Sequence, residues 1–234
     1  MIYSICRSGQ KQLPFLKRSR TRIENTNGKN ENGELGVFGI VKIPENELFI
    51  GFEHNRRYFS DDEGETLPLS EKQLQEKLKD HKIVCGEYRF GGNHNGDLGI
   101  QIKNLLFPYT QQFIDRALKY YPDMKTSIDF VLNNNFIFPH NMFYTTVENF
   151  KEIQTFIKKV FLDVREVWCP DSTPEHHKGK MKAMFSETML TAFYIYKFGI
   201  NNIAINNITL FDREFKEIVD PITGINHPDA KRNK

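Results

Sequence analysis

Cysteine is scarce in this chain of 234 residues, and long apolar runs and a large excess of either charge are absent. Its three cysteines, Cys6, Cys85 and Cys169, show no metal-type spacing, and their odd number predicts free thiols in a reducing compartment. No stretch approaches the length of a membrane span, and the residues before Arg7 are too few for a secretory signal. We therefore expect a cytoplasmic protein.

The net charge of +2 argues against a protein that binds polyanions through its overall charge. The basic residues still form runs at 17–22, 178–182 and 231–234. Such runs are usually solvated, but they could also make peripheral contact with an anionic membrane, here its inner face. The length and composition predict one α/β domain over residues 31–220. A basic segment, 1–30, with a first strand near Ile2 would precede it, and a loose tail, 221–234, would follow.

The chain is organised around residues 47–59, where a short apolar run predicts a buried strand and a polar cluster follows. In an open α/β sheet, ligands bind at the carboxyl ends of the strands. Arg56 and Arg57 repel each other, and a phosphate between them would accept bonds from both guanidinium groups. The alternative is that one arginine pairs with Glu53 or Asp61 while the other is solvated.

A second strand-and-cluster unit follows the first. Ser70 and Gln73 form the pattern of a capping box at the start of a helix, and Leu69 and Leu74 that of a hydrophobic staple. A buried strand at 82–85 then ends in a polar, glycine-rich segment. The alternation predicts an α/β fold in which both polar segments emerge at the same edge of the sheet.

The remaining sequence predicts further elements with less regular boundaries. Residues 7–33 are polar and predict a loop, whereas 34–41 is ambiguous between helix and strand. We expect a strand at 136–144 with the polar pair His140 and Asn141 inside it, a long helix at 147–168, and a final strand at 203–210. The polar residues 169–184 predict a loop that could serve as a lid, and a new helix would start at 185–187.

The stretch FIGFEHNRRYF at 49–59 resembles the "yiGl-HYRRyF" signature of the DUF4422 family, which occurs among bacterial capsule and exopolysaccharide glycosyltransferases. Glu34-Leu35 resembles its "ELT" block, and Tyr121-Pro122 its "PeY" region. Residues 140–143 resemble its "NMFI" block and 185–190 its "fsERLlt" block. Asn55 stands where the family has tyrosine and Thr188 where it usually has arginine, and the donor-side strands near the N-terminus look abbreviated.

The resemblance implies a GT-A-like mixed sheet flanked by helices in a single domain. It also implies a nucleotide-sugar-dependent glycosyltransferase whose acceptor is a glycan or lipid-linked glycan, as in capsule, exopolysaccharide or lipopolysaccharide synthesis. We expect no organic cofactor. A Mn²⁺ or Mg²⁺ ion would be compatible with such a fold, although Glu53 and Asp61 are weak candidates for its ligands.

Sugar transfer needs a cation beside the leaving diphosphate, a base for the acceptor hydroxyl and a pocket that aligns the two. We expect the donor to be bound by His54, Arg56, Arg57 and Tyr58. We expect the acceptor to be bound by His140 and Asn141, although Asn141 could instead tie down a neighbouring loop. Glu187 is the predicted base, in the first turn of a helix capped by Ser186.

The sequence also fits other interpretations. The dipole of a helix favours a carboxylate in its first turn, so Glu187 needs no function to be there. The base would then be sought at Glu53, Asp61 or Asp97. The protein could also be an inactive nucleotide- or carbohydrate-binding module. A single-stranded nucleic-acid-binding protein would use the basic N-terminal run and an Arg-Arg-Tyr-Phe stacking surface, but the low net charge leads us to expect no nucleic-acid partner.

Overall fold

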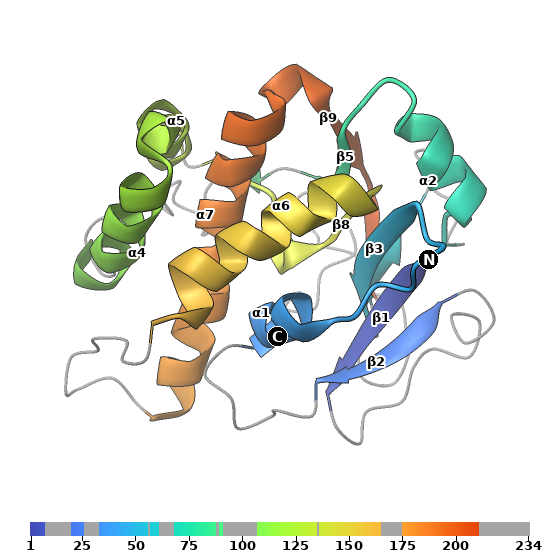
Figure 1. Cartoon of the computed structure of the whole chain (residues 1–234), viewed down its shortest axis with the longest axis horizontal. Helices are drawn as coiled ribbons and strands as arrows, with labels where there is room; N and C mark the ends of the chain where they lie inside the picture. Colours follow the sequence, from blue (N-terminus) through green and yellow to red (C-terminus); the bar gives the residue numbers. More distant parts are fainter. Residues whose placement is uncertain are drawn as a thin grey trace, which may run out of the picture.

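The structure is a computed structural model that describes residues 1–7, 20–25, 33–55, 57–60, 68–87, 89–90, 107–134, 136–164 and 175–210. Within these residues it is a mixed α/β fold, with a main sheet that has helices packed on it (Figure 1). The strands of the main sheet are β1 (Ile2–Arg7), β2 (Thr21–Asn25), β3 (Phe49–His54), β4 (Arg57–Phe59), β5 (Ile83–Gly86), β8 (Phe143–Thr146), β9 (Ile203–Asn206) and β10 (Ile208–Leu210). A second, two-stranded sheet pairs β6 (Arg89–Phe90) with β7 (Phe136–Ile137).

Helical elements lie between the strands along the chain. They are α1 (Gly33–Ile40), α2 (Glu71–Lys77), α4 (Phe107–Tyr120), η2 (Pro122–Met124), α5 (Lys125–Asn134), η3 (Pro139–Asn141), α6 (Val147–Ile157), η4 (Lys158–Leu162), α7 (Glu175–Phe198) and η5 (Ile200–Asn202). No helix within the described ranges is both long and apolar enough to cross a membrane.

The direction of the strands confirms the expected common edge. β1 pairs in parallel with both β2 and β3, and β5 pairs in parallel with β9. Between these groups lies β8, which is antiparallel to β3 on one side and to β5 on the other. The strands β1, β2, β3, β5 and β9 therefore all run the same way, and their carboxyl ends lie at one edge of the sheet.

Alternating side chains give the sheet two apolar faces. On β3, Ile50 and Phe52 face α1, α6 and α7, where Phe52 meets the ring of Phe38 at 4.8 Å and that of Phe143 at 5.3 Å. The opposite face carries Ile2, Val84 and Tyr144 and packs against α2. Gly51 lies beside Tyr144, and a methyl group at this position would stand 2.5 Å from the tyrosine ring.

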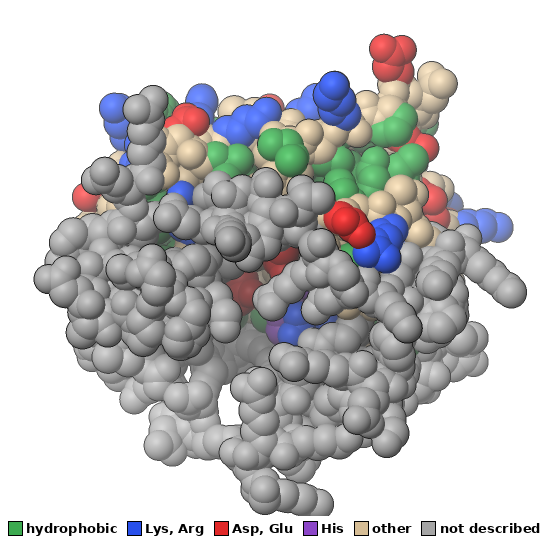
Figure 2. Space-filling view, turned by 90° about the horizontal axis from the view of Figure 1, so that it is seen from below, with side chains coloured by type: hydrophobic (Ala, Val, Ile, Leu, Met, Phe, Trp, Pro, Cys, Tyr) green, Lys and Arg blue, Asp and Glu red, His purple; other side chains and the backbone are tan. Residues whose placement is uncertain are grey.

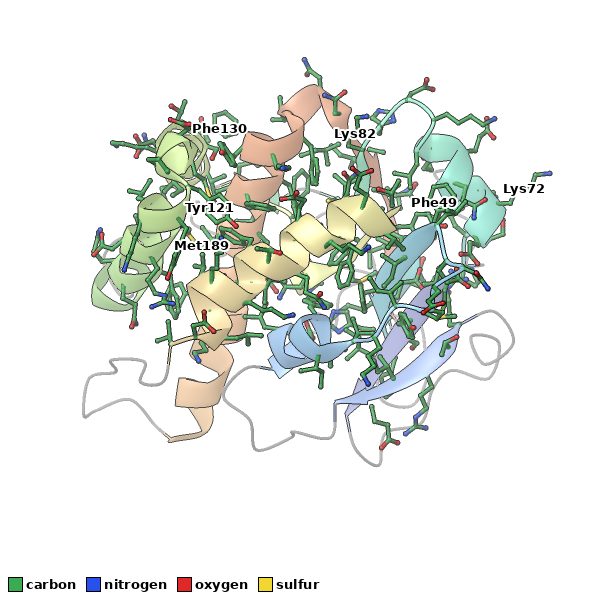
Figure 3. All side chains as sticks on the ribbon, viewed as in Figure 1. Phe49, Lys72, Lys82, Tyr121, Phe130 and Met189 are labelled. Carbon is green, nitrogen blue, oxygen red and sulfur yellow. The ribbon has the colours of Figure 1, made fainter. Side chains whose placement is uncertain are left out.

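Figure 1 shows α7 between the sheet and the α4–α5 pair, with α6 crossing it. The side chains of Tyr121 and Met189 lie between α7 and that pair (Figure 3), and Tyr121 contacts the ring of Phe193 at a centroid distance of 5.7 Å. Gly199 follows α7 with a positive φ of 79°, the left-handed conformation in which glycine commonly ends a helix.

Predictions based on local signals are confirmed. The capping box is present, since the backbone N–H of Gln73 donates to Ser70 Oγ and Gln73 Oε1 accepts from the backbone N–H of Ser70. Leu69 and Leu74 are both buried. The expected strands near 47–52 and 82–85 are β3 and β5, although β3 extends to His54, so Glu53 and His54 belong to the strand itself.

Five expected boundaries are wrong. The helix expected at 147–168 consists of α6 and the π-helical segment η4, and it ends at Leu162. Residues 21–25, predicted as loop, form β2, because their backbone completes a ladder with β1. The strand predicted at 136–144 is interrupted at 139–141 by a turn, and the one at 203–210 divides into β9 and β10. The lid predicted at 169–184 is helical from residue 175 onward, because α7 begins at Glu175.

Candidate functional site

The carboxyl edge of the parallel strands gathers the polar side chains. Phe49 begins β3 and Lys82 precedes β5, and both lie toward the upper edge of the molecule in Figure 3. The carboxyl ends of these strands therefore lie toward the face that is seen from below. In that view, acidic, basic and histidine side chains are visible close together near the centre of the face (Figure 2). We take this edge as the candidate site.

His54, the last residue of β3, is the centre of a set of contacts. Its Nδ1 lies 3.1 Å from Glu34 Oε1, which belongs to the first turn of α1. Its Nε2 lies 2.6 Å from the backbone carbonyl oxygen of His140. The two histidine rings meet edge to face, with centroids 6.4 Å apart. One side chain thus joins a helix start, a strand end and the turn at 139–141.

The turn at 139–141 has an unusual backbone. His140 has φ of 74° and Asn141 has φ of 51°, so two successive residues other than glycine adopt left-handed conformations. Such residues cluster at functional sites, where the surroundings hold them in place. Pro139 and Asn141 are common turn formers, so the sequence contained a turn signal that the surrounding apolar run obscured.

Helix α7 anchors the other side of this turn. Asn141 Nδ2 donates to Ser186 Oγ at 3.0 Å, and both residues are buried. The backbone N–H of Phe138 donates to Thr191 Oγ1 at 2.9 Å, and that hydroxyl donates to the carbonyl oxygen of Glu187. The expected alternative role of Asn141 was to tie down a neighbouring loop, whereas its side chain ties the turn to helix α7.

Glu53 is held by a buried ion pair. Arg20 Nε donates to Glu53 Oε2 at 2.6 Å, and the backbone N–H of Phe59 donates to Oε1 at 3.0 Å. Burial raises the pKa of the Glu53 carboxyl, and the bound Arg20 guanidinium opposes that rise. Because both carboxylate oxygens face these donors and the side chain is wholly buried, Glu53 does not fit a hard-cation ligand in this arrangement.

The other residues that were predicted to bind the donor differ in how deeply they are buried. Arg57 opens β4 directly opposite His54, and it is half-buried. Tyr58 is fully buried, so in this structure it supports β4 from inside the protein. Arg56, Asp61 and the alternative base Asp97 lie outside the described residues. No group of three His, Cys, Asp or Glu side chains with metal-site geometry occurs among the residues that the structure describes.

Glu187 lies in a different setting from the one expected. It is not in the first turn of a helix, since α7 begins twelve positions earlier, at Glu175, and Ser186 is not a cap but the acceptor of the Asn141 amide. The helix-dipole explanation for this carboxylate therefore no longer applies. Glu187 is half-buried. It directly follows Ser186, the residue whose hydroxyl accepts the hydrogen bond from Asn141 in the turn at 139–141.

The structure brings His54, His140 and Asn141 together, and it adds three residues that were not among the predicted site residues. Glu34 and Ser186 stood in stretches that resemble family blocks, so the resemblance offered a signal for both. For Arg20 the sequence held no such signal, because this residue belongs to a basic run, and basic runs predict solvated side chains. In the structure its side chain is only 1% exposed.

An apolar cavity of about 330 Å³ lies elsewhere, between α5 and the end of α7. Phe130, Ile195, Tyr196 and Ile200 line it, with Asp123 as a charged neighbour. Ile200 begins η5, the short helical segment that directly precedes β9, so the cavity lies near the amino ends of the strands. It is therefore separate from the candidate site.

Comparisons with known proteins identify the family and the fold. Residues 27–197 match the profile of a family described as "Domain of unknown function (DUF4422)". No curated protein matches the sequence significantly. Among solved structures, the apo structure of WbbM, a bifunctional glycosyltransferase, is similar, with a TM-score of 0.62 and 13% sequence identity. The match covers 89% of this chain but only 45% of that one, and it confirms the expected GT-A-like α/β fold.

Proposed function

The chain belongs to the DUF4422 family, and from that premise we propose that it is a glycosyltransferase. It would move a sugar from a nucleotide-diphosphate donor to a glycan or lipid-linked glycan. Two findings support this proposal, the fold shared with a glycosyltransferase and a polar cluster at the carboxyl edge of the parallel strands, where open α/β sheets bind ligands.

One observation carries the proposal furthest. Four segments that resemble family blocks are joined by direct contacts at that edge. Glu34 contacts His54, His54 contacts the carbonyl of His140, and Asn141 donates to Ser186. A stability requirement alone does not demand that four polar segments meet at the ligand-binding edge of a sheet, whereas a substrate site does.

On the donor side, we assign the diphosphate to Arg57 together with Arg56. A guanidinium group stays charged and can donate two parallel bonds to phosphate oxygens. His54 would add positive charge when it is protonated, and buried Tyr58 would support the strand that carries Arg57. These cations would stabilise the negative charge that develops on the leaving nucleoside diphosphate.

On the acceptor side, we assign the sugar hydroxyl to the turn of His140 and Asn141, with Glu187 as the base. The acceptor oxygen would attack the anomeric carbon while its proton passes to the Glu187 carboxylate. The bond from that carbon to the diphosphate oxygen would break, and the electron pair would leave with the nucleotide. A Mn²⁺ or Mg²⁺ ion is a proposed cofactor, and Glu53 does not fit as its ligand, because both of its carboxylate oxygens already accept hydrogen bonds.

We also propose that the reaction belongs to surface-polysaccharide synthesis at the cytoplasmic side of a membrane. A lipid-linked acceptor would be presented there, and basic segments of the chain would contact anionic headgroups. The support for this part is the family alone, so it depends on the transferase proposal.

A thermal-shift screen tests the proposal with the full chain. Nucleoside diphosphates and nucleotide sugars are added with and without Mn²⁺, and each stabilising donor is then tested for transfer to glycan acceptors. We expect at least one nucleoside diphosphate to raise the melting temperature and its sugar derivative to support transfer. Stabilisation without transfer would favour an inactive binding module. No stabilisation by any nucleotide would overturn the proposal.

A further inference from the structure

The two contacts of the His54 ring indicate how many protons the ring carries. Both of its ring nitrogens face oxygen atoms, Glu34 Oε1 at 3.1 Å and the carbonyl oxygen of His140 at 2.6 Å. A carbonyl oxygen can only accept a hydrogen bond, and so can an ionised carboxylate. A neutral imidazole has one N–H and could satisfy only one of them. An imidazolium has two N–H groups and satisfies both.

We propose that Glu34 is a positioning residue that holds His54 as an imidazolium, whose second N–H fixes the left-handed turn at His140 and Asn141. The contact between Glu34 and His54 is protected, since their side chains are 25% and 11% exposed. Partial burial strengthens the attraction between a carboxylate and an imidazolium by reducing its screening by water. The assignment of this turn to the acceptor rests on the proposed function. The protonation state of His54 does not depend on it.

The turn needs such support. Two left-handed residues other than glycine in succession are strained and persist only where neighbouring groups determine their conformation. Asn141 is held from α7 through Ser186. His140 contributes its carbonyl oxygen, and the His54 ring approaches that atom from β3. Removal of the N–H from Nε2 would leave two acceptors facing each other and release that side of the turn.

A simpler explanation is that Glu34 is a carboxylate favoured by the start of α1. That explanation predicts no dependence of His54 on Glu34. A second alternative is a neutral pair, in which a protonated Glu34 donates to Nδ1 of a neutral His54. The imidazolium carries two ring protons and the neutral His54 ring carries one, which nitrogen NMR distinguishes, whereas the helix-start explanation is tested by whether the His54 signals depend on Glu34.

The experiment uses the full chain with ¹⁵N-labelled histidine and asparagine, and His54→Gln identifies the His54 signals. At neutral pH we expect both ring nitrogens of His54 to show the shifts of N–H groups. In Glu34→Gln, which keeps an oxygen acceptor but removes the charge, one nitrogen should shift to the unprotonated range. The Asn141 side-chain amide, identified with Asn141→Ala, should shift as well. Glu152→Gln, which removes a carboxylate from an exposed pair with Lys197, is the matched control.

A neutral His54 ring in the unmodified protein would overturn the proposal, and so would a Glu34→Gln variant with unchanged His54 and Asn141 signals. If transfer is detected, Glu34→Gln should raise the acceptor KM by about tenfold, and nucleotide affinity should fall as well, because a neutral His54 no longer adds positive charge beside the diphosphate. Glu34→Asp should recover part of that loss. Altered NMR signals with an unchanged acceptor KM would refute the positioning role. Confirmed signals without transfer to any acceptor would leave the positioning of the turn standing and count against the proposed function alone.

Discussion

Arg20 and Glu53 form a buried ion pair that joins the entry of β2 to the end of β3. Arg20 Nε donates to Oε2 at 2.6 Å and Nη2 to Oε1 at 3.2 Å, and the two side chains are 1% and 0% exposed. Arg20 Nη2 also donates to the carbonyl oxygen of Leu69 at 2.7 Å. The pair therefore fixes three segments around the strand that ends in His54.

We expect Arg20→Ala to lower the free energy of unfolding by about 3–5 kcal/mol, because it leaves the Glu53 carboxylate buried without its counter-charge. Arg22→Ala is the control, since Arg22 pairs with Glu24 on the surface, and it should cost less than about 1 kcal/mol. Urea unfolding measures both. The double variant Arg20→Ala/Glu53→Leu should recover part of the loss, and equal losses for Arg20→Ala and the control would contradict the assignment.

The left-handed conformation of Asn141 can be tested by comparing two substitutions. Both Asn141→Ala and Asn141→Gly lose the hydrogen bond to Ser186, but only alanine must also adopt an unfavourable φ of 51°. We expect the glycine variant to be more stable by about 1 kcal/mol in urea unfolding. In both variants, transfer activity should fall by a larger factor than the change in melting temperature explains. Equal stabilities would show that the turn is relaxed in the alanine variant.

Of the two adjacent arginines, Arg57 is the one that lies within the described residues. We expect Arg57→Ala to weaken nucleotide binding by about 1.5–3 kcal/mol, the range for a charge-assisted hydrogen bond. Isothermal titration calorimetry measures the change, and Arg22→Ala serves as the matched removal of a surface guanidinium. The affinity should also fall with added salt. An affinity equal to that of the control would remove Arg57 from the donor site.

Glu187→Gln tests the proposed base, because glutamine keeps the shape of the side chain but cannot accept the proton. We expect turnover to fall by about 100-fold or more, with nucleotide affinity and melting temperature nearly unchanged. Glu152→Gln should retain full turnover. If Glu187→Gln is as active as this control, the base lies elsewhere, and Asp61 and Asp97 become the next candidates.

The described cysteines should be unreactive in the folded protein. Burial raises the pKa of both Cys6 and Cys85, although the nearby Arg22 opposes the rise at Cys6. A raised thiol pKa means that the folded state holds the proton more tightly, so this contribution to stability decreases as pH rises above the unfolded value of about 8.5. In a Cys169→Ser variant at pH 8, iodoacetamide should label these thiols only after urea is added. Rapid labelling without urea would contradict the prediction.

Local signals in the sequence predicted local structure well. The capping box at Ser70 and Gln73 acts within one turn, so no distant contact was needed to specify it. The parallel arrangement of β3 and β5 followed from the repeated strand-and-cluster pattern. The interruption at His140 was missed because the apolar residues around it have strand-like propensity, and the contacts that hold the turn come from β3 and α7.

The remaining errors concern interactions between distant segments. The start of α7 was predicted about ten residues too late, because its first turns are polar and show no apolar period. The role of Arg20 depends on a partner 33 residues away, and a basic run gives no sign of such a partner. Propensity and period describe neighbours along the chain, whereas a buried charge is determined by the tertiary fold.

The meeting of distant segments at His54 has a consequence for the order in which the molecule folds. The contact to His140 closes 86 residues of chain, and the contact from Asn141 to Ser186 closes a further 45. Ordering such long loops is entropically costly, and contacts of this range form slowly compared with helices such as α2. On refolding, helical content should therefore return before ligand binding does. A nascent chain that has not yet released α7 from the ribosome would carry every strand from β1 to β8 and still lack the Ser186 contact that anchors the turn and the proposed base, Glu187.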